Sequence, residues 1–292
     1  MNTSYYKVAG HVFALQLPQD KAAEWLPSFA PFIINYSADD PLLFTLTVDE
    51  TFYPSERGDT IGQFDCGGAD FGVYRLPDGG YQFLISPPGG KYCGLLQTAP
   101  DFTNGIVALR GNDWAKAFAV NNSLMLMYAF ASADKNTLLF HASVVGYQER
   151  GYLFLGVSGT GKSTHSSLWL KHIPGSELIN DDNPVVVATP TGAIVYGSPW
   201  SGKTPCYRNV SATIGAFVRI RQEKQNTITR DDTLQAFASL LTSVSSMKWD
   251  DRVYDGICDT LSSLIENVPC YTLGCLPDQQ AAELCHDTVT SI

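Results

Sequence analysis

The stretch GVSGTGKS at residues 156–163 decides how the rest of the sequence is interpreted. It fits the pattern G-x-x-x-x-G-K-[S/T], the Walker A motif, which is specific when a strand precedes it and a helix follows. An apolar run at 152–155 predicts the strand, and residues 162–173 predict a helix that Pro174 and Gly175 end. The sequence therefore predicts a phosphate-binding loop (P-loop), with ATP and Mg²⁺ as its ligands.

The residue types of this loop suit an anion. Glycines let successive backbone N–H groups point inward, and the N-terminus of the following helix adds a favourable dipole. Lys162 is expected to reach the β- and γ-phosphates, and the hydroxyl of Ser163 to bind Mg²⁺. The residues expected to contact the nucleotide are Gly156, Ser158, Gly159, Thr160, Gly161, Lys162, Ser163 and Thr164.

A second stretch, GSPWSGKT at 197–204, fits the same pattern in a poorer context. Pro199 and Trp200 stiffen it, and a strand-like run follows in place of a helix. We expect it to be an active-site loop that brings Lys203 and Arg208 toward phosphate. The alternatives are that this stretch is itself the nucleotide cradle, or that these two residues are ordinary solvent-exposed charges.

Paired carboxylates follow the next predicted strand, at 177–180. A right-handed crossover makes that strand parallel to the one before the loop, so Asp181 and Asp182 lie at the same sheet edge as the phosphates. One carboxylate there can hold Mg²⁺, and the other can accept a proton from an attacking hydroxyl. The alternative is a plain Asp-Asp-Asn-Pro turn.

His141 lies on a predicted strand at 137–145. Only four residues, 148–151, join this strand to the one at 152–155, which is too few for a parallel crossover, so the two are expected to be antiparallel neighbours. His141 could then orient or tune one of the aspartates. The alternative is a satisfied core histidine.

The rest of the sequence predicts an α/β protein of two domains, 1–112 and 113–292. The first is β-rich and carries no catalytic motif; its strand-like runs are 12–17, 42–48, 72–76 and 81–86. The second begins with a helix at 113–131 capped by Asp113. Its remaining elements are a hairpin at 185–196, a strand at 212–221, helices at 232–246 and 252–267, a strand at 270–273 and a last helix from 277.

Composition limits the partners. With 29 acidic and 19 basic residues, the formal charge of −10 does not favour general binding of nucleic acid or anionic membrane. We expect a cytoplasmic protein, because no apolar run is long enough to cross a bilayer and no secretory signal is apparent. Seven cysteines without a CxxC pair indicate reduced thiols, and the spacing of Cys270, Cys275 and His286 does not fit a zinc site.

Four features together resemble the catalytic domain of HPr kinase/phosphorylase, which shares a P-loop fold with phosphoenolpyruvate carboxykinase. They are the block FHAS at 140–143, the antiparallel pair, GVSGTGKST at 156–164 and LINDD at 178–182. The resemblance is best over 138–182 and does not cover 1–112. It implies a kinase that transfers the γ-phosphate of ATP to a hydroxyl, often of serine. It also implies that His141, Lys162, Ser163 and Asp181 act together, with Asp181 accepting the proton and Asp182 on the metal side.

Departures from the family change the expected substrate. HPr kinases usually carry Glu where Thr164 stands, and their downstream glycine-rich signature is not found. The expected acceptor is therefore a serine of a peptide or of another protein, or a small hydroxyl compound. The alternatives are a nucleotide-sensing module with little turnover, a simple ATPase, and carboxykinase-type transfer, for which no manganese site is evident. A second copy of the chain, in a homo-oligomer, is kept as an alternative partner.

Overall fold

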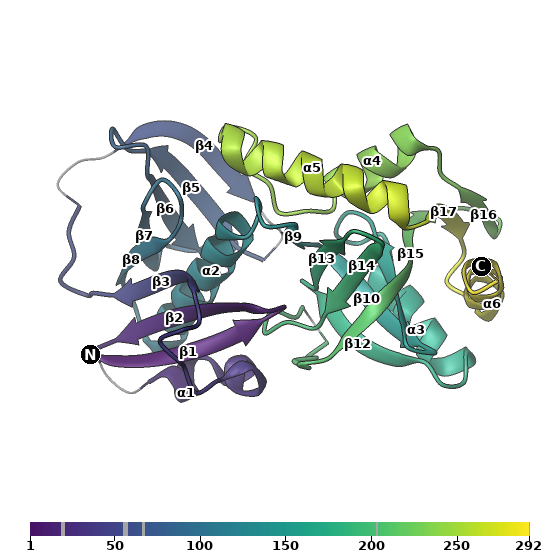
Figure 1. The fold of residues 1–292 in the computed structure, drawn as a ribbon, viewed down its shortest axis with the longest axis horizontal. Helices are drawn as coiled ribbons and strands as arrows, with labels where there is room; N and C mark the ends of the chain where they lie inside the picture. The colour runs from purple at the N-terminus through teal and green to yellow at the C-terminus, as the bar shows by residue number, and fades with distance from the viewer. Residues whose placement is uncertain (19–20, 55–57, 66–67, 203, 292) are drawn as a thin grey trace. The chain divides into compact units, whose positions relative to one another are not determined.

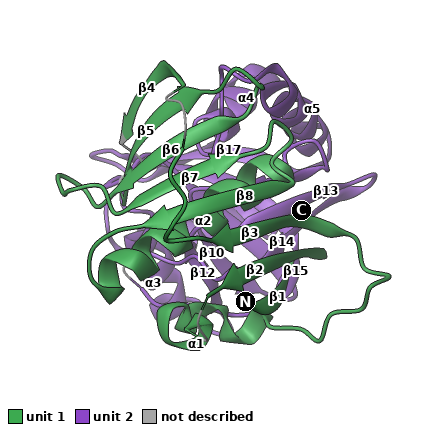
Figure 2. Cartoon of the chain, turned by 90° about the vertical axis from the view of Figure 1, so that its left-hand side faces the viewer, with its two compact units in different colours: residues 1–132 green, residues 133–292 purple. Residues whose placement is uncertain are grey.

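The structure, a computed structural model, describes residues 1–18, 21–54, 58–65, 68–202 and 204–291. The chain divides into two compact units, Met1–Ser132 and Ala133–Ile292, coloured separately in Figure 2. Each unit carries a mixed sheet, so the architecture is mixed α/β. Helix α2 (Asp113–Ala131) belongs to the first unit, because it packs on the strands of that unit. This division falls after α2, whereas the sequence predicts it before that helix.

The first unit is built on one sheet with the strand order β1-β2-β3-β8-β7-β6-β5-β4. The strand β3 is parallel to β2 and β8, and the other neighbours are antiparallel. The bounds of its elements are β1 Asn2–Val8, β2 His11–Leu17, α1 Ala22–Trp25, the 3-10 helix η1 Pro27–Phe32, β3 Leu42–Val48, β4 Asp59–Asp65, β5 Asp70–Arg75, β6 Tyr81–Ser86, β7 Gly94–Thr98 and β8 Asn104–Leu109.

Helix α2 covers this sheet through an almost entirely buried C-terminal half. Its predicted face includes Val120, Leu124 and Met127, and all three are buried. The cap differs from the prediction: the side chain of Asn112 accepts the N–H of Ala115 at 3.0 Å, so Asn112 is the N-cap and the predicted cap, Asp113, is the first helical residue.

The second unit contains a sheet with the order β12-β10-β11-β15-β14-β13-β9, and β17 and β16 extend it from β15 (Figure 1). The pairs β11–β15 and β15–β17 are parallel, and the rest are antiparallel. The bounds are β9 Thr137–Leu139, β10 Ala142–Tyr147, β11 Arg150–Leu155, α3 Lys162–His172, β12 Glu177–Asp182, β13 Val185–Thr189, β14 Gly192–Tyr196, β15 Ser211–Gln222, β16 Thr227–Arg230, α4 Thr233–Leu241, α5 Asp251–Asn267, β17 Cys270–Cys275 and α6 Gln279–Val289.

The strands around α3 fix the position of the glycine-rich loop. β10 and β11 form the predicted antiparallel hairpin, and β12 lies on the other side of β10. Because β10 is antiparallel to both, β12 runs parallel to β11, and the two strands end at one edge of the sheet. Helix α3 packs on β10, β11 and β12 through a core that includes Trp169 and Phe154. The loop at 156–161 and the aspartates of β12 therefore share an edge.

The segment that follows α4 also reaches this edge. The N–H of His141 donates to the carbonyl of Ser243 at 2.6 Å, and Phe140 forms an antiparallel bridge with Val244. These contacts interrupt the strand predicted at 137–145, which the structure divides into β9 and β10. None of the helices in the described residues is both long enough and apolar enough to span a membrane.

Candidate functional site

The glycine-rich loop connects β11 to α3 in a conformation that needs its glycines. Gly156, Gly159 and Gly161 have φ values of 145°, 85° and 105°, which L side chains rarely adopt. A Cβ on Gly156 would also lie 2.6 Å from Thr160 Oγ1. Within the loop, the N–H and hydroxyl of Thr160 both donate to the carbonyl of Val157, at 3.2 and 2.8 Å. The loop thus curls tightly in front of the N-terminus of α3.

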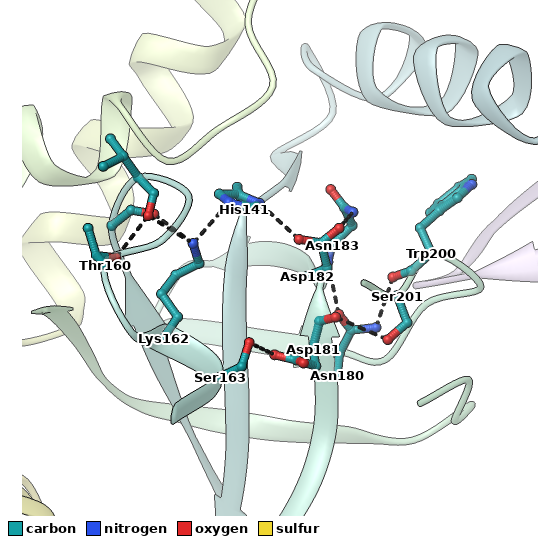
Figure 3. Close-up of polar contacts among 12 residues, drawn as sticks. His141, Thr160, Lys162, Ser163, Asn180, Asp181, Asp182, Asn183, Trp200 and Ser201 are labelled. Carbon is teal, nitrogen blue, oxygen red and sulfur yellow. Dashed lines mark hydrogen bonds and ion pairs between the residues drawn. The ribbon is translucent and has the colours of Figure 1, made fainter. Parts of the chain in front are cut away.

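Lys162 is the first residue of α3, and its side chain folds back over the loop (Figure 3). Its Nζ donates to the carbonyl of Gly156 at 2.8 Å and lies 2.9 Å from His141 Nε2. Lys162 is 8% exposed, and this burial lowers the pKa of its ammonium group, although Asp182 and Asp181 act in the opposite direction. An anion bound in the loop would restore the lost solvation of this charge.

Ser163 joins the loop helix to the first aspartate of β12. Its hydroxyl donates to Asp181 Oδ1 at 2.8 Å (Figure 3), and Asp181 is 4% exposed. A serine hydroxyl and a carboxylate both offer an oxygen ligand, the type of metal ligand that Mg²⁺ prefers. The two side chains therefore form a chemically suitable pair for this ion.

His141 connects Lys162 to the second aspartate. Its Nδ1 lies 3.1 Å from Asp182 Oδ1, while Nε2 faces Lys162. A protonated lysine donates to Nε2, so the ring proton is assigned to Nδ1, where it points at Asp182. The side chains of His141 and Asp182 are 39% and 34% exposed, so both remain open to a ligand.

These contacts agree with the expected grouping for Ser163 and Asp181, but they place His141 beside Asp182. The resemblance implies that His141, Lys162, Ser163 and Asp181 act together, and that Asp182 is the metal-side or supporting carboxylate. In the structure Asp181 faces Ser163 and Asp182 faces His141. The two carboxylates differ because neighbouring residues of a strand point to opposite faces, and the register between β10 and β12 together with the backbone at Asp182 decides which partner each one has.

The backbone at Asp182 is unusual for a non-glycine residue. Its φ is 142°, a conformation that costs about 1–3 kcal/mol and persists only when its surroundings enforce it. The stretch at 197–204 supplies part of that enforcement: Ser201 forms a bridge with Asp182, and the N–H of Gly202 donates to the carbonyl of Asp181 at 2.6 Å. The Ser201 hydroxyl donates to the same carbonyl at 3.0 Å.

A buried polar network supports this loop, and nothing in the sequence pattern singles it out. Asn180 is fully buried, and its amide donates to Ser198 Oγ at 3.3 Å and to the Trp200 carbonyl at 3.2 Å. Its Oδ1 accepts the N–H of Asn183 at 3.0 Å. These bonds join the ends of β12 and of the 197–204 stretch, and so hold the aspartates in position.

Two further predicted residues have different outcomes. Arg208 binds the start of β12, where it donates to the Leu178 carbonyl at 2.6 Å and pairs with Glu177 at 2.7 Å. Glu177 and Asp181 are four positions apart on the extended strand, a distance of roughly 13 Å. This corrects the expectation that Arg208 reaches the phosphates. Lys203 lies outside the described residues.

No family model matches the sequence, and no curated protein matches it. Solved structures to which the chain is similar include the Hpr(Ser) kinase/phosphatase from Coxiella burnetii. The identity is 15% and the TM-score 0.31, over 52% of this chain and 94% of that one.

Within the described residues, no group of three or more His, Cys, Asp or Glu side chains could hold a metal ion. Cys270, Cys275 and Cys285 are buried free thiols, and burial raises the pKa of each. His286 packs edge-on against Trp169 and pairs with Asp287. A Mg²⁺ ion at Ser163 and Asp181 would take its other ligands from phosphate and water, as Mg²⁺ usually does.

Proposed function

We propose that this chain is an ATP-dependent, Mg²⁺-requiring kinase that transfers the γ-phosphate to a hydroxyl group. One observation carries the proposal. At the shared edge of β11 and β12, a glycine-rich loop with a buried lysine faces two aspartates, and His141 and Ser163 connect the two sides. A phosphate cradle and two carboxylates with different partners are the parts that phosphoryl transfer requires.

The loop and Lys162 would hold the triphosphate. The positive φ values turn the loop backbone into a curl whose N–H groups can converge on an anion, and the dipole of α3 adds to this. The Lys162 ammonium, now bound to the Gly156 carbonyl and to His141, would turn to the β- and γ-phosphates. Exchange of a carbonyl and a neutral imidazole for phosphate oxygens is favourable for a buried cation.

Ser163 and Asp181 would hold the Mg²⁺ ion. Their oxygens already lie in hydrogen-bond contact, and Asp181 is almost fully buried. When bound, Mg²⁺ would neutralise the charge that develops on the β- and γ-phosphates.

Asp182 would take the proton of the acceptor hydroxyl. The acceptor oxygen forms a bond to the γ-phosphorus, the bond from that phosphorus to the β–γ bridging oxygen breaks, and the proton goes to the carboxylate as ADP leaves. His141 orients Asp182 by donating to it from Nδ1. This assignment exchanges the roles that the resemblance implies for the two aspartates, because it follows their observed partners.

The acceptor class is expected to be a serine of a peptide or protein, or a small hydroxyl compound. Incubation with γ-labelled ATP and Mg²⁺ tests this, with free serine, serine peptides and carrier proteins as acceptors. We expect label in one of them with the wild-type chain and none with Lys162→Ala. Lys171→Ala is the matched control, because Lys171 is an exposed lysine on the same helix.

Three results would contradict the proposal. Label transfer that survives Lys162→Ala would rule out the loop as the phosphate cradle. Release of labelled phosphate with every acceptor would indicate an ATPase. Binding of ATP without turnover, unchanged in Asp182→Asn, would indicate a nucleotide sensor.

A further inference from the structure

A pocket of about 500 Å³ opens beside the glycine-rich loop, on the side away from the aspartates. Residues 156–160 form one wall, the end of β15 (219–222) with the following Glu223 forms the second, and Thr242 and Ser243 form the third. Its volume lies within the range of sites that bind small organic ligands. The proposed kinase chemistry uses the loop but leaves this pocket without a role.

The pocket is continuous with the loop through direct contacts. Arg219 is the register partner of Leu155, the last residue before the loop, so the end of β15 runs alongside the loop. The side chain of Gln222 donates to the carbonyls of Gly159 and Thr160 at 3.2 and 3.5 Å. A ligand whose phosphates occupy the loop can therefore extend into the pocket without a gap.

The opposite wall belongs to the same site. Ser243 lines the pocket, and its carbonyl accepts the N–H of His141, whose ring contacts Lys162. The aspartates lie on the other side of Lys162, where His141 Nδ1 meets Asp182 (Figure 3). Lys162 thus stands between the pocket and the carboxylates, which gives the site two distinct ends.

Two arginines give the pocket its chemistry. Arg219 and Arg221 are two residues apart on a strand, so they point to the same face, while Ile220 between them faces the core under α3. Arg219 donates to Ser239 Oγ of α4 at 3.5 Å, a long hydrogen bond. Planar guanidinium groups stack on aromatic rings and donate to ring nitrogens and hydroxyls.

The charge balance favours an uncharged part of the ligand. Glu223 also lines the pocket, and Asp231 lies close enough to Arg219 and Arg221 for both to act on its pKa, which burial raises. The positive charge of the arginines is therefore partly compensated. The Glu223 carboxylate can accept hydrogen bonds from ribose hydroxyls and base edges. The hydroxyls of Thr242 and Ser243 donate to carbonyls of Ala238 and Ser239, and their oxygens can still accept from a ligand. A second polyphosphate would instead meet the negative charge of Glu223.

We propose that this pocket binds the nucleoside end of the nucleotide, with Arg219 and Arg221 against the base and ribose. The inference rests on the proposed function, since it requires the triphosphate in the loop. It gives the ligand a direction: the nucleoside lies between β15 and the end of α4, the γ-phosphate points past Lys162, and the acceptor approaches from Asp182.

The test compares two probes in the presence of Mg²⁺, a non-hydrolysable ATP analogue and inorganic tripolyphosphate. Both carry the phosphates, and the analogue alone carries a nucleoside. We expect the wild-type chain to bind the analogue about 10-fold or more tightly than tripolyphosphate. Arg219→Ala/Arg221→Ala should remove most of this preference and leave the dissociation constant of tripolyphosphate within about 3-fold. Lys224→Ala/Arg230→Ala removes the same number of charges from exposed positions outside the pocket and should keep the preference.

The outcomes separate this inference from the proposed function. Failure of the wild-type chain to bind either probe would overturn the kinase proposal. Binding of both with an unchanged preference in the arginine variant, or an equal loss for both, would overturn the nucleoside assignment alone. If the arginine variant does not fold, photolabelling of the wild-type chain with 8-azido-ATP decides. Label in peptides that contain 219–223 or 242–243 supports the inference, and label elsewhere overturns it.

Discussion

The Ser163 hydroxyl lies 2.8 Å from Asp181 Oδ1, whereas the neighbouring Asp182 pairs with His141 Nδ1 at 3.1 Å. Two adjacent carboxylates thus have different partners, one on the loop helix and one on the histidine. Because the partners differ, removal of each charge should affect a different measurable quantity.

Asp182→Asn and Asp181→Asn should separate turnover from metal dependence. Loss of the proton acceptor in Asp182→Asn should lower kcat by about 100-fold or more, with little change in nucleotide affinity. Asp181→Asn should raise the Mg²⁺ concentration for half-maximal activity by roughly 10-fold or more, because it weakens a metal ligand. Steady-state kinetics across a Mg²⁺ series measures both. If Asp181→Asn instead lowers kcat and Asp182→Asn instead raises the Mg²⁺ requirement, then Asp181 accepts the proton and Asp182 binds the metal, as the resemblance implies.

Asp182→Gly should be more stable than Asp182→Ala, although both lose the carboxylate and its contact with His141. At a φ of 142° glycine is unstrained, whereas alanine keeps the strain of the aspartate. After allowance for the greater unfolded-state entropy of glycine, we expect a difference of about 1 kcal/mol in the free energy of unfolding. Urea titration of both variants measures it. Equal stabilities, or a more stable alanine variant, would show that this backbone is not strained.

Nucleotide binding should take up protons at alkaline pH. Burial lowers the pKa of Lys162 from its usual 10.5, and a bound triphosphate should raise it again. Affinity is then highest below the lowered pKa and falls as the pH rises through it, and protons are taken up between the free and bound values.

Calorimetry from about pH 8 to about pH 10, in buffers of different ionisation enthalpy, measures this uptake. Lys162→Arg, whose side chain does not titrate in this range, is the control. Equal uptake by the control would place the titrating group elsewhere.

His165 should make the stability depend on pH. It is 2% exposed, and burial lowers its pKa from 6.5 to about 4. Trp169 Nε1 donates to its Nε2 at 3.2 Å, and its Nδ1 is a buried atom without a partner in the described structure. The folded state therefore favours the neutral ring.

Because the pKa of His165 is lower in the folded state, the protein loses stability as the pH falls. The contribution of the neutral ring is complete above pH 6.5 and is lost as the pH falls toward 4, which amounts to roughly 3 kcal/mol. The free energy of unfolding is measured for the wild-type chain and for His165→Gln at about pH 7.5 and about pH 4.5. The difference between the two proteins separates the contribution of His165 from that of the carboxylates. Parallel losses in the two proteins would mean that His165 does not titrate as stated.

The sequence was sufficient for the local parts of the site. The strand, the loop and the helix at 152–172 follow from short-range rules, because glycine conformations and helix starts depend on neighbouring residues. The short link at 148–151 excluded a parallel crossover, and the structure confirms the antiparallel pair. The handedness of crossovers then placed Asp181 and Asp182 at the loop's edge of the sheet.

The tertiary structure decided how those parts face one another. The register between β10 and β12 and the backbone turn at Asp182 determine which aspartate meets Ser163 and which meets His141. The network of Asn180 with Ser198 and the placement of Arg219 beside the loop join segments far apart in the chain. Spacing within a sequence fixes which edge of a sheet a residue reaches, whereas side-chain direction depends on contacts between distant segments that no local pattern records.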